Sequence, residues 1–347
     1  MRASASRRSR GGTRQRAVIT DVASMAGVSH QTVSRVLHES PLVRTETRDR
    51  VLAAIRMLNY RPSSVAQALA TGRSKTLGVV SFDTTLFGPA ATMVGIERAA
   101  HEAGYNVAIA SIESLDRASV ETAIERLRLQ SADGIVVVAP HFSVFDTLRT
   151  FASDVPIVAV GAGPEGLIPL VAVDQFSGAR LATDHLLELG HRTVWHIAGP
   201  ADWLDSERRI DGWRAALKKA GVQAPPVLRG DWSARSGYDL GREILAKGEA
   251  TAVFVANDQM ALGLLRQLQV SGRQSPRDLS IVGFDDIPEA EYFNPPLTTV
   301  RQNFQEVGHR CLHLLLGQIE KVSPRSPHLT VPAELVVRES TGAPAGK

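Results

Sequence analysis

Features typical of several protein classes are absent from this sequence of 347 residues. It has a single cysteine, Cys311, which excludes a disulfide framework and any zinc site built on cysteines. Its ten histidines show no spacing typical of metal ligands, so no metal or cofactor is expected. No apolar run approaches the roughly 18 residues that cross a membrane, and the N-terminus lacks the apolar core of a signal peptide. We therefore expect a cytoplasmic protein with no membrane partner.

Motifs of the common enzyme classes are also missing. The sequence contains no Walker A, GxSxG or HExxH pattern. GAGPEG at residues 161–166 formally matches a dinucleotide fingerprint, but Pro164 interrupts the helix that such a motif must open, so a turn is expected. Asp285 and Asp286 could serve acid–base chemistry, yet no nucleophile, base or metal set accompanies them. Binding therefore outweighs catalysis, and the protein is expected not to be an enzyme.

What the sequence does have is a lopsided charge. Residues 1–75 contain 14 Lys and Arg against 4 Asp and Glu, whereas acidic residues exceed basic ones in the remainder. A basic head on an acidic body suggests that only the head binds a polyanion. Residues 1–16 are rich in Arg, Ser and Gly without apolar periodicity, so we expect a disordered basic tail.

Three short helices are predicted in residues 17–62. The first has Thr20 as a plausible N-cap and ends at Gly27, and Ser29 can cap the second. In the second helix Val33 and Val36 share one side. The opposite side carries polar residues, namely His30, Gln31, Ser34 and Arg35. The third helix, about residues 46–58, has an apolar stripe of Val51, Leu52, Ile55 and Leu58.

Helix, glycine turn and helix followed by a third helix is the layout of a DNA-binding helix-turn-helix. A helical hairpin with another purpose is the alternative. The polar side favours DNA, because Gln31 can pair bidentately with adenine and Arg35 with guanine, while His30 can add a contact to a base edge. After it, SSVAQALATG predicts a helix too short to be stable alone, so residues 63–75 are expected to be a hinge helix and linker that fold conditionally.

From residue 76 to 347 the sequence alternates strands with amphipathic helices. Seven apolar runs predict strands: TLGVVSF, NVAIASI, DGIVVVA, PIVAV, TVWHIAG, TAVFVAN and LSIVGF. This alternation indicates parallel sheets covered on both faces, in too many units for one small sheet. We expect an α/β body of two doubly wound parallel-sheet lobes with a ligand cleft between them; a (β/α)8 barrel is the alternative. His185 and His191 are expected to be favourable charges near a helix C-terminus rather than ligands.

Motifs along most of the chain resemble one family of regulators. VASMAGVSHQTVSRVLHES and LNYRPSSVAQALATG resemble the DNA-binding head and hinge of the lac repressor and galactose repressor (LacI/GalR) family. GDWSARSGY, VFVANDQMALG, IVGFDD and PPLTTVRQNF extend the likeness through the body, so that it covers residues 18 to about 340. The resemblance implies an all-α helix-turn-helix head and a body similar to periplasmic binding proteins.

The resemblance assigns candidate DNA contacts residue by residue. His30, Gln31 and Arg35 fall on base-reading positions. Leu69 falls on the hinge leucine that wedges into the minor groove, where unstacking a base step costs a few kcal/mol. The other DNA contacts that it implies are Thr20, Ser29, Ser34 and Ala66. Because Val18 stands where the family usually has a capping threonine, the first helix is expected to begin later, at Thr20.

The resemblance also implies an effector site for a small sugar, with galactosides as the first candidates. The expected contacts are Leu86, Pro89, Asp174, Asp205, Arg209, Trp232, Asn257, Asp285 and Phe304. Trp232 offers a flat face for a pyranose ring. Gly161 and Asp205 depart from the sugar-binding pattern, since a carboxylate is usual at the first position and a small hydroxyl residue at the second. Asp174 is expected to supply the missing acceptor.

The function implied is a transcription repressor that binds double-stranded operator DNA as a homodimer and responds to a sugar. The chain ends in TGAPAGK without heptads, so an additional tetramerising helix is not expected. Whether the sugar acts as an inducer or a co-repressor stays open. The alternative is a sugar-binding protein or sugar-processing enzyme with a similar two-lobed body.

Overall fold

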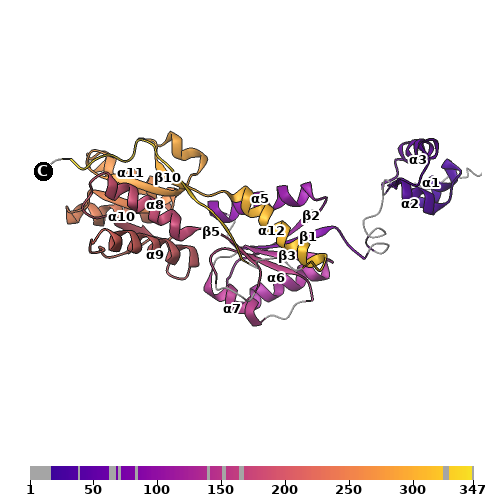
Figure 1. The fold of residues 1–347 in the computed structure, drawn as a ribbon, viewed down its shortest axis with the longest axis horizontal. Coiled ribbons are helices and arrows are strands. Elements are labelled where there is room, and N and C mark those ends of the chain that lie inside the picture. The colour runs from indigo at the N-terminus through magenta and orange to yellow at the C-terminus, as the bar shows by residue number, and fades with distance from the viewer. Residues whose placement is uncertain are drawn as a thin grey trace, which may run out of the picture. The chain divides into compact units, whose positions relative to one another are not determined.

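The computed structural model of the chain comprises two compact units, Met1–Ser74 and Lys75–Lys347, and each is described by itself (Figure 1). The residues that the structure describes are 17–37, 40–61, 68, 72–82, 85–138, 141–150, 154–163, 168–322 and 328–345. The expected basic tail, residues 1–16, lies outside them. Among the described residues, no helix has the length and apolar character that a membrane crossing requires.

The first unit is a bundle of three helices, α1 (Ile19–Ala26), α2 (His30–Leu37) and α3 (Thr45–Met57). Its core contains apolar residues from all three: Val22, Ala23, Ala26, Val33, Val36, Val51 and Ala54. Leu52 was expected on the buried stripe of α3 but is 37% exposed, and Ala54 is buried instead. Gly27 ends α1 as predicted, with a φ of 65° that a residue with a Cβ would adopt only at a steric cost.

The start of α1 corrects the expectation for Thr20. The helix begins at Ile19 with Val18 as its N-cap, and Thr20 lies exposed in the first turn. A valine side chain cannot accept a hydrogen bond. The Asp21 carboxylate accepts one from the Val18 N–H at 2.9 Å, and its negative charge also suits the N-terminal end of the helix dipole. This contact replaces a threonine cap.

The second unit consists of two lobes, each built on a six-stranded sheet. The sheet of lobe 1 has the order β11-β5-β4-β3-β1-β2, and every pair in it is parallel. Its strands are β1 (Thr76–Phe82), β2 (Asn106–Ile112), β3 (Gly134–Val138), β4 (Ile157–Val160), β5 (Leu170–Val173) and β11 (His328–Val331). Its helices are α5 (Phe87–Glu102), α6 (Arg117–Leu129), α7 (Phe142–Thr150) and α12 (Phe304–Ile319).

The sheet of lobe 2 has the order β12-β10-β9-β8-β6-β7. Its strands are β6 (Trp195–Ala198), β7 (Leu228–Arg229), β8 (Ala252–Val255), β9 (Ser280–Asp285), β10 (Thr298–Arg301) and β12 (Glu334–Val336), of which only β12 runs antiparallel to its neighbour. Its helices are α8 (Gln175–Glu188), α9 (Leu204–Lys219), α10 (Ala234–Lys247), α11 (Asp258–Val270) and the short 3-10 helix η1 (Pro288–Tyr292).

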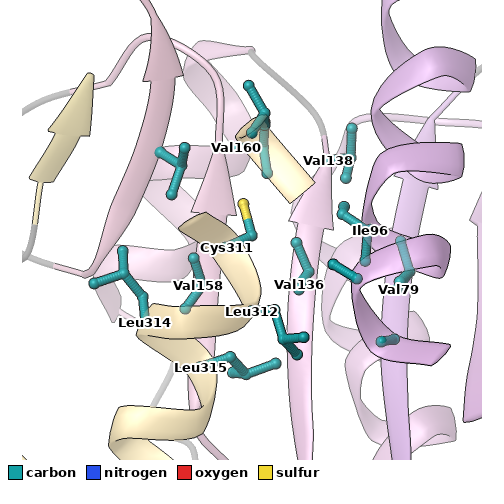
Figure 2. Close-up of a cluster of buried hydrophobic side chains, with 14 of the residues drawn as sticks. Val79, Ile96, Val136, Val138, Val158, Val160, Cys311, Leu312, Leu314 and Leu315 are labelled. Carbon is teal, nitrogen blue, oxygen red and sulfur yellow. The ribbon is translucent and has the colours of Figure 1, made fainter. Parts of the chain in front are cut away.

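Helices cover both faces of each sheet, because alternate strand residues point to opposite faces and are apolar on both. On β8, Val253 and Val255 pack with α11, while Ala252 and Phe254 pack with α8 and α9. In lobe 1, α5 and α12 cover one face and α6 and α7 the other. Figure 2 shows side chains of α12, including Cys311, packed against β3, β4 and α5. The doubly wound lobes are confirmed, and the barrel alternative is wrong.

The chain passes between the lobes three times: from β5 into α8, from β10 into α12, and from β11 into β12. All seven predicted strands are present, with ends shifted by at most two residues. The strands β5, β7, β10, β11 and β12 were not among those predicted. α12 follows the last strand of the lobe 2 core in sequence yet belongs to lobe 1, where it lies beside α5 (Figure 1).

The expectation that His185 and His191 act as charges is wrong. His185 Nε2 lies 3.0 Å from Thr341 Oγ1, and the two ring nitrogens of His191 lie 2.9 Å from Thr251 Oγ1 and 3.0 Å from the Gly342 carbonyl oxygen. Burial lowers the pKa of both imidazoles. At neutral pH they are therefore neutral hydrogen-bonding groups that tie the C-terminal segment to lobe 2.

We predict that His196 makes stability depend on pH. The ring is fully buried, stacks on Phe254 with centroids 4.6 Å apart, and burial lowers its pKa to about 3. In the unfolded chain the His196 ring is protonated below about pH 6.5, whereas in the folded chain it stays neutral. Its contribution to the free energy of unfolding is therefore fully present above that pH and is lost as the pH falls. Urea unfolding should show wild type losing about 1.1 kcal/mol per pH unit relative to His196→Phe between pH 6.5 and 5. The exposed His101→Phe serves as control, and parallel curves for wild type and His196→Phe would contradict the assignment.

Candidate functional site

The polar side of α2 is open to solvent. His30, Gln31 and Arg35 are exposed, whereas Val33 and Val36 on the opposite side are buried in the bundle. The helix therefore presents an imidazole, an amide and a guanidinium from one rigid surface. These are groups that can reach the edges of bases in a DNA major groove.

The other residues expected to contact DNA occupy different environments. Thr20 and Ser29 are exposed, Ser34 is half-buried, and Ala66 and Leu69 lie outside the described residues. Ser29 caps α2 as predicted, because its Oγ accepts a hydrogen bond from the Thr32 N–H at 3.2 Å. At the end of the expected hinge helix, Gly72 has a φ of 70° and its N–H donates to the Ala68 carbonyl at 2.8 Å.

A cleft of about 700 Å³ lies between lobe 1 and lobe 2. Lobe 1 lines it mainly with apolar side chains: Leu86, Phe87, Pro89, Val138, Val160, Val173, Phe304 and Val307. Lobe 2 adds aromatic and polar ones: Trp203, Asp205, Arg209, Trp232, Asn257 and Asp285. The strand ends that border the cleft are where open α/β sheets bind ligands. Eight of the nine expected effector contacts line this cleft.

A closed ring of polar contacts surrounds the Arg209 guanidinium, which is only 4% exposed. Its Nε donates to Gln175 Oε1 at 2.8 Å, and Gln175 Nε2 donates to Gln302 Oε1 at 3.0 Å. Gln302 Nε2 then donates to Asp285 Oδ1 at 2.6 Å. Asp285 Oδ1 lies 3.7 Å from Arg209 Nη2, which completes the ring. Arg209 also donates to the Ala256 carbonyl.

Within this ring, burial and the neighbouring charges shift the pKa values in opposite directions. Burial raises the pKa of Asp285 to about 6, against the effects of Arg209 and Gln302, which stabilise its ionised form. Burial likewise lowers the pKa of Arg209, while the carboxylates of Asp285, Asp205 and Asp258 oppose that shift. A guanidinium held this way can donate hydrogen bonds to the hydroxyl groups of a ligand, and a carboxylate can accept hydrogen bonds from neighbouring hydroxyls.

Aromatic rings form two pairs in the cleft wall. Phe87 and Phe304 of lobe 1 meet edge to face with centroids 5.9 Å apart, and Trp203 and Trp232 of lobe 2 do the same at 5.7 Å. The Trp232 Nε1–H is buried and has no hydrogen-bond partner among the residues that the structure describes. It is therefore a donor available to a ligand.

Two residues of the cleft have a strained backbone. Trp232 and Asp285 have φ angles of 73° and 114°, a region that residues with a Cβ rarely adopt. Both residues line the cleft. Asn257 is more fully used by the protein: its side chain caps α11 by accepting from the Met260 N–H and donates to the Trp232 carbonyl and to Gln259.

Asp205 spans the cleft where Gly161 leaves space. Its Oδ1 accepts a hydrogen bond from the Ala162 N–H of lobe 1 at 2.9 Å, and burial raises its pKa. A carboxylate therefore approaches the end of β4 from α9 of lobe 2. This contact occupies only one oxygen of the carboxylate among those that the structure describes.

One expectation for a carboxylate is corrected. Asp174 does not line the cleft, and its Oδ1 caps α8 by accepting from the Ser177 N–H at 2.9 Å. Asp285 and Asp286 are not paired carboxylates, in line with the preference for binding: Asp285 lines the cleft, whereas the Asp286 carboxylate lies 2.6 Å from Arg301 and 2.7 Å from Arg338. Among the described residues, no group of three His, Cys, Asp or Glu side chains could hold a metal ion.

Sequence reasoning missed five polar or aromatic cleft residues: Phe87, Thr92, Gln175, Trp203 and Gln302. Gln175 follows the carboxyl end of β5 and Gln302 that of β10. The rule that ligands bind at the carboxyl ends of parallel strands could have identified both. Trp203 precedes α9 and carried no such signal.

Comparisons with known proteins find relatives of both parts of the chain. A family model described as "Bacterial regulatory proteins, lacI family" matches residues 18–63, and one described as "Periplasmic binding protein-like domain" matches residues 183–341. The lactose operon repressor of Escherichia coli (strain K12) is 34% identical over 327 residues, 93% of this chain and 90% of that protein. The repressor PurR of Haemophilus influenzae (strain PittEE) is 33% identical over 93% of this chain and 98% of its own length.

Solved structures give the same result. The lac repressor dimer bound to operator and the anti-inducer ONPF has a TM-score of 0.85 and 32% identity, over 95% of this chain and all of that one. The transcriptional regulator CelR in complex with cellobiose has a TM-score of 0.70 and 33% identity, over 94% of this chain and all of that one.

We predict that the polar ring is strongly coupled. Asp285→Ala leaves the buried Arg209 guanidinium without its charged partner and should lower the free energy of unfolding by about 3 kcal/mol. The double variant Arg209→Met with Asp285→Ala should be less destabilised, because it has no unpaired buried charge. Asp239→Ala, in an exposed pair on α10, should change stability by less than about 1 kcal/mol. Urea unfolding of wild type, Asp285→Ala, Arg209→Met, the double variant and Asp239→Ala checks this, and additive losses for the two single variants would show that the ring is not coupled.

Proposed function

This chain belongs to the lacI family of bacterial regulatory proteins and is a DNA-binding transcriptional repressor; we propose that a small sugar bound in the cleft controls its release from the operator. Its relatives are repressors and not enzymes. The observation that carries the effector proposal is the buried ring around Arg209, set between aromatic walls in a cleft that both lobes line.

We assign DNA reading to residues 17–62, and within them to His30, Gln31 and Arg35 of α2. Their exposure beside the buried Val33 and Val36 supports this assignment. We further assign residues 63–75 to a hinge, with Ala66 and Leu69 as its DNA contacts, and residues 76–347 to effector binding and dimerisation. Two copies would place one α2 in each half-site of a pseudo-palindromic operator in the cytoplasm.

The cleft suits a polyhydroxylated ligand. Its charged groups, Arg209, Asp205 and Asp285, are few and include both signs, which favours hydroxyl groups over an anion. Apolar ring faces pack against sugar rings, and the free Trp232 Nε1–H can donate to a hydroxyl. Galactosides are the first candidates, because the lac repressor is a relative; cellobiose is the second, because CelR binds it.

We predict that Gln31 and Arg35 carry operator specificity. Gln31→Ala and Arg35→Ala should each weaken binding to an operator selected from random DNA by 5- to 150-fold, the equivalent of about 1–3 kcal/mol. Binding of Gln31→Ala to unrelated DNA should hardly change, because phosphate contacts supply that affinity. Fluorescence anisotropy at two salt concentrations measures both, with Arg235→Ala of the body as control. Wild-type operator preference in either variant would refute the assignment.

We predict a sugar-specific response that depends on Arg209. Isothermal titration against galactosides, cellobiose, glucose and purine bases should identify a sugar that also changes operator affinity. Arg209→Met should bind that sugar at least about tenfold more weakly, since it loses a charge-assisted hydrogen bond, while retaining operator binding without sugar. Asp239→Asn is the matched control. Binding of purine bases alone would overturn the sugar proposal and leave the repressor assignment intact.

A further inference from the structure

A four-residue segment of lobe 2, Asp202–Asp205, reaches across the cleft to lobe 1. It lies at the N-terminal end of α9, whose later turns are buried in the core of lobe 2. Leu204 instead packs against the hydrophobic cluster formed by β1, β2, β3, α6 and α7 of lobe 1. The N-terminal end of α9 therefore packs against lobe 1, while the rest of the helix packs in lobe 2.

Polar contacts surround this apolar anchor. The Asp202 carboxylate lies 3.0 Å from His141 Nε2, and the Asp202 carbonyl accepts a hydrogen bond from the Phe142 N–H at 3.4 Å. His141 also forms an antiparallel β-bridge with Trp203. The His141 ring is fixed on its own lobe, because its Nδ1 lies 2.8 Å from Ser143 Oγ. The hydrogen bond to His141 lowers the pKa of Asp202, because it stabilises the ionised carboxylate.

The same segment supplies two walls of the cleft. The Trp203 ring lies between Phe82 of lobe 1, at 6.3 Å, and Trp232 of lobe 2, at 5.7 Å. Asp205 accepts the hydrogen bond from the Ala162 N–H described above. Any movement of the segment away from lobe 1 therefore displaces an aromatic wall and a carboxylate from the ligand site.

We propose that Asp202–Asp205 form a clasp that holds the two lobes together at the cleft, and that His141 and Asp202 are positioning residues for Trp203 and Asp205. The clasp holds Trp203 and Asp205 in place in the cleft before a ligand binds. Its role in effector response rests on the proposed function, but its existence does not, because every contact in it is made by the chain itself.

The clasp predicts cooperative exposure of two separate amides in lobe 1. The Phe142 and Ala162 N–H groups donate to different residues of the segment, the Asp202 carbonyl and the Asp205 carboxylate. If the segment acts as a unit, Asp202→Ala opens both, although the Asp202 side chain touches neither amide. A purely local role would change exchange only near residue 142.

Hydrogen exchange read by mass spectrometry on the full-length protein, without added ligand, tests this. Peptides covering residues 140–147 and 156–163 should exchange two- to fivefold faster in Asp202→Ala, the range of a solvent-exposed ion pair. In Leu204→Ala they should exchange about five- to tenfold faster, as expected for partial loss of a buried leucine. Matched controls on lobe 2 are Asp239→Ala and the exposed Leu262→Ala.

The melting temperature separates a positioning role from general destabilisation. For Asp202→Ala it should stay within a few degrees of wild type while both peptides exchange faster. Unchanged exchange at residues 156–163 in both clasp variants would overturn the proposal, as would equal acceleration by the control variants. Failure of the sugar panel would refute the effector proposal without affecting this result.

Discussion

The buried guanidinium of Arg209 is the constraint around which the cleft is organised. An unpaired charge out of water is costly, so its position demands partners with good geometry. Two of them, Gln175 and Gln302, stand where the chain crosses between the lobes, and Asp285 stands at the end of β9. The positions of the segments that cross between the lobes and the pairing of the buried charges in the cleft therefore depend on each other. A ligand that engages Arg209 or Asp285 acts directly on groups tied to the crossover strands.

The head is governed by different physics. Its small core of valines and alanines holds three short helices, and the side chains on one side of α2 do not pack in that core. Side chains such as Gln31 and Arg35 are thus free to be selected for what they bind. In the body, by contrast, nearly every polar group of the cleft also holds the fold, as the cap made by Asn257 illustrates.

The sequence revealed what depends on local periodicity. Seven strands, the turn at Gly27 and the exposed side of α2 follow from apolar spacing and from glycine, and all were found. It failed where long-range contacts decide. The membership of α12 in lobe 1 and the burial of His191 against Gly342 depend on segments far apart in sequence. Asp174 failed for another reason: the resemblance suggested a ligand, but its side chain caps the adjoining helix α8 through Ser177, a local contact.

One helix connects these features mechanically. Arg209 lies about one turn after Asp205 on α9, so the polar ring and the segment that contacts lobe 1 are parts of the same rigid rod. A rotation of α9 that improves one contact must shift the other, because the helix transmits it without bending. A ligand that binds Arg209 would therefore act on Trp203 and Leu204 through the same helix, without touching the crossovers. Small changes in the cleft can thereby become discrete changes in how the lobes meet, as expected of tightly packed interiors.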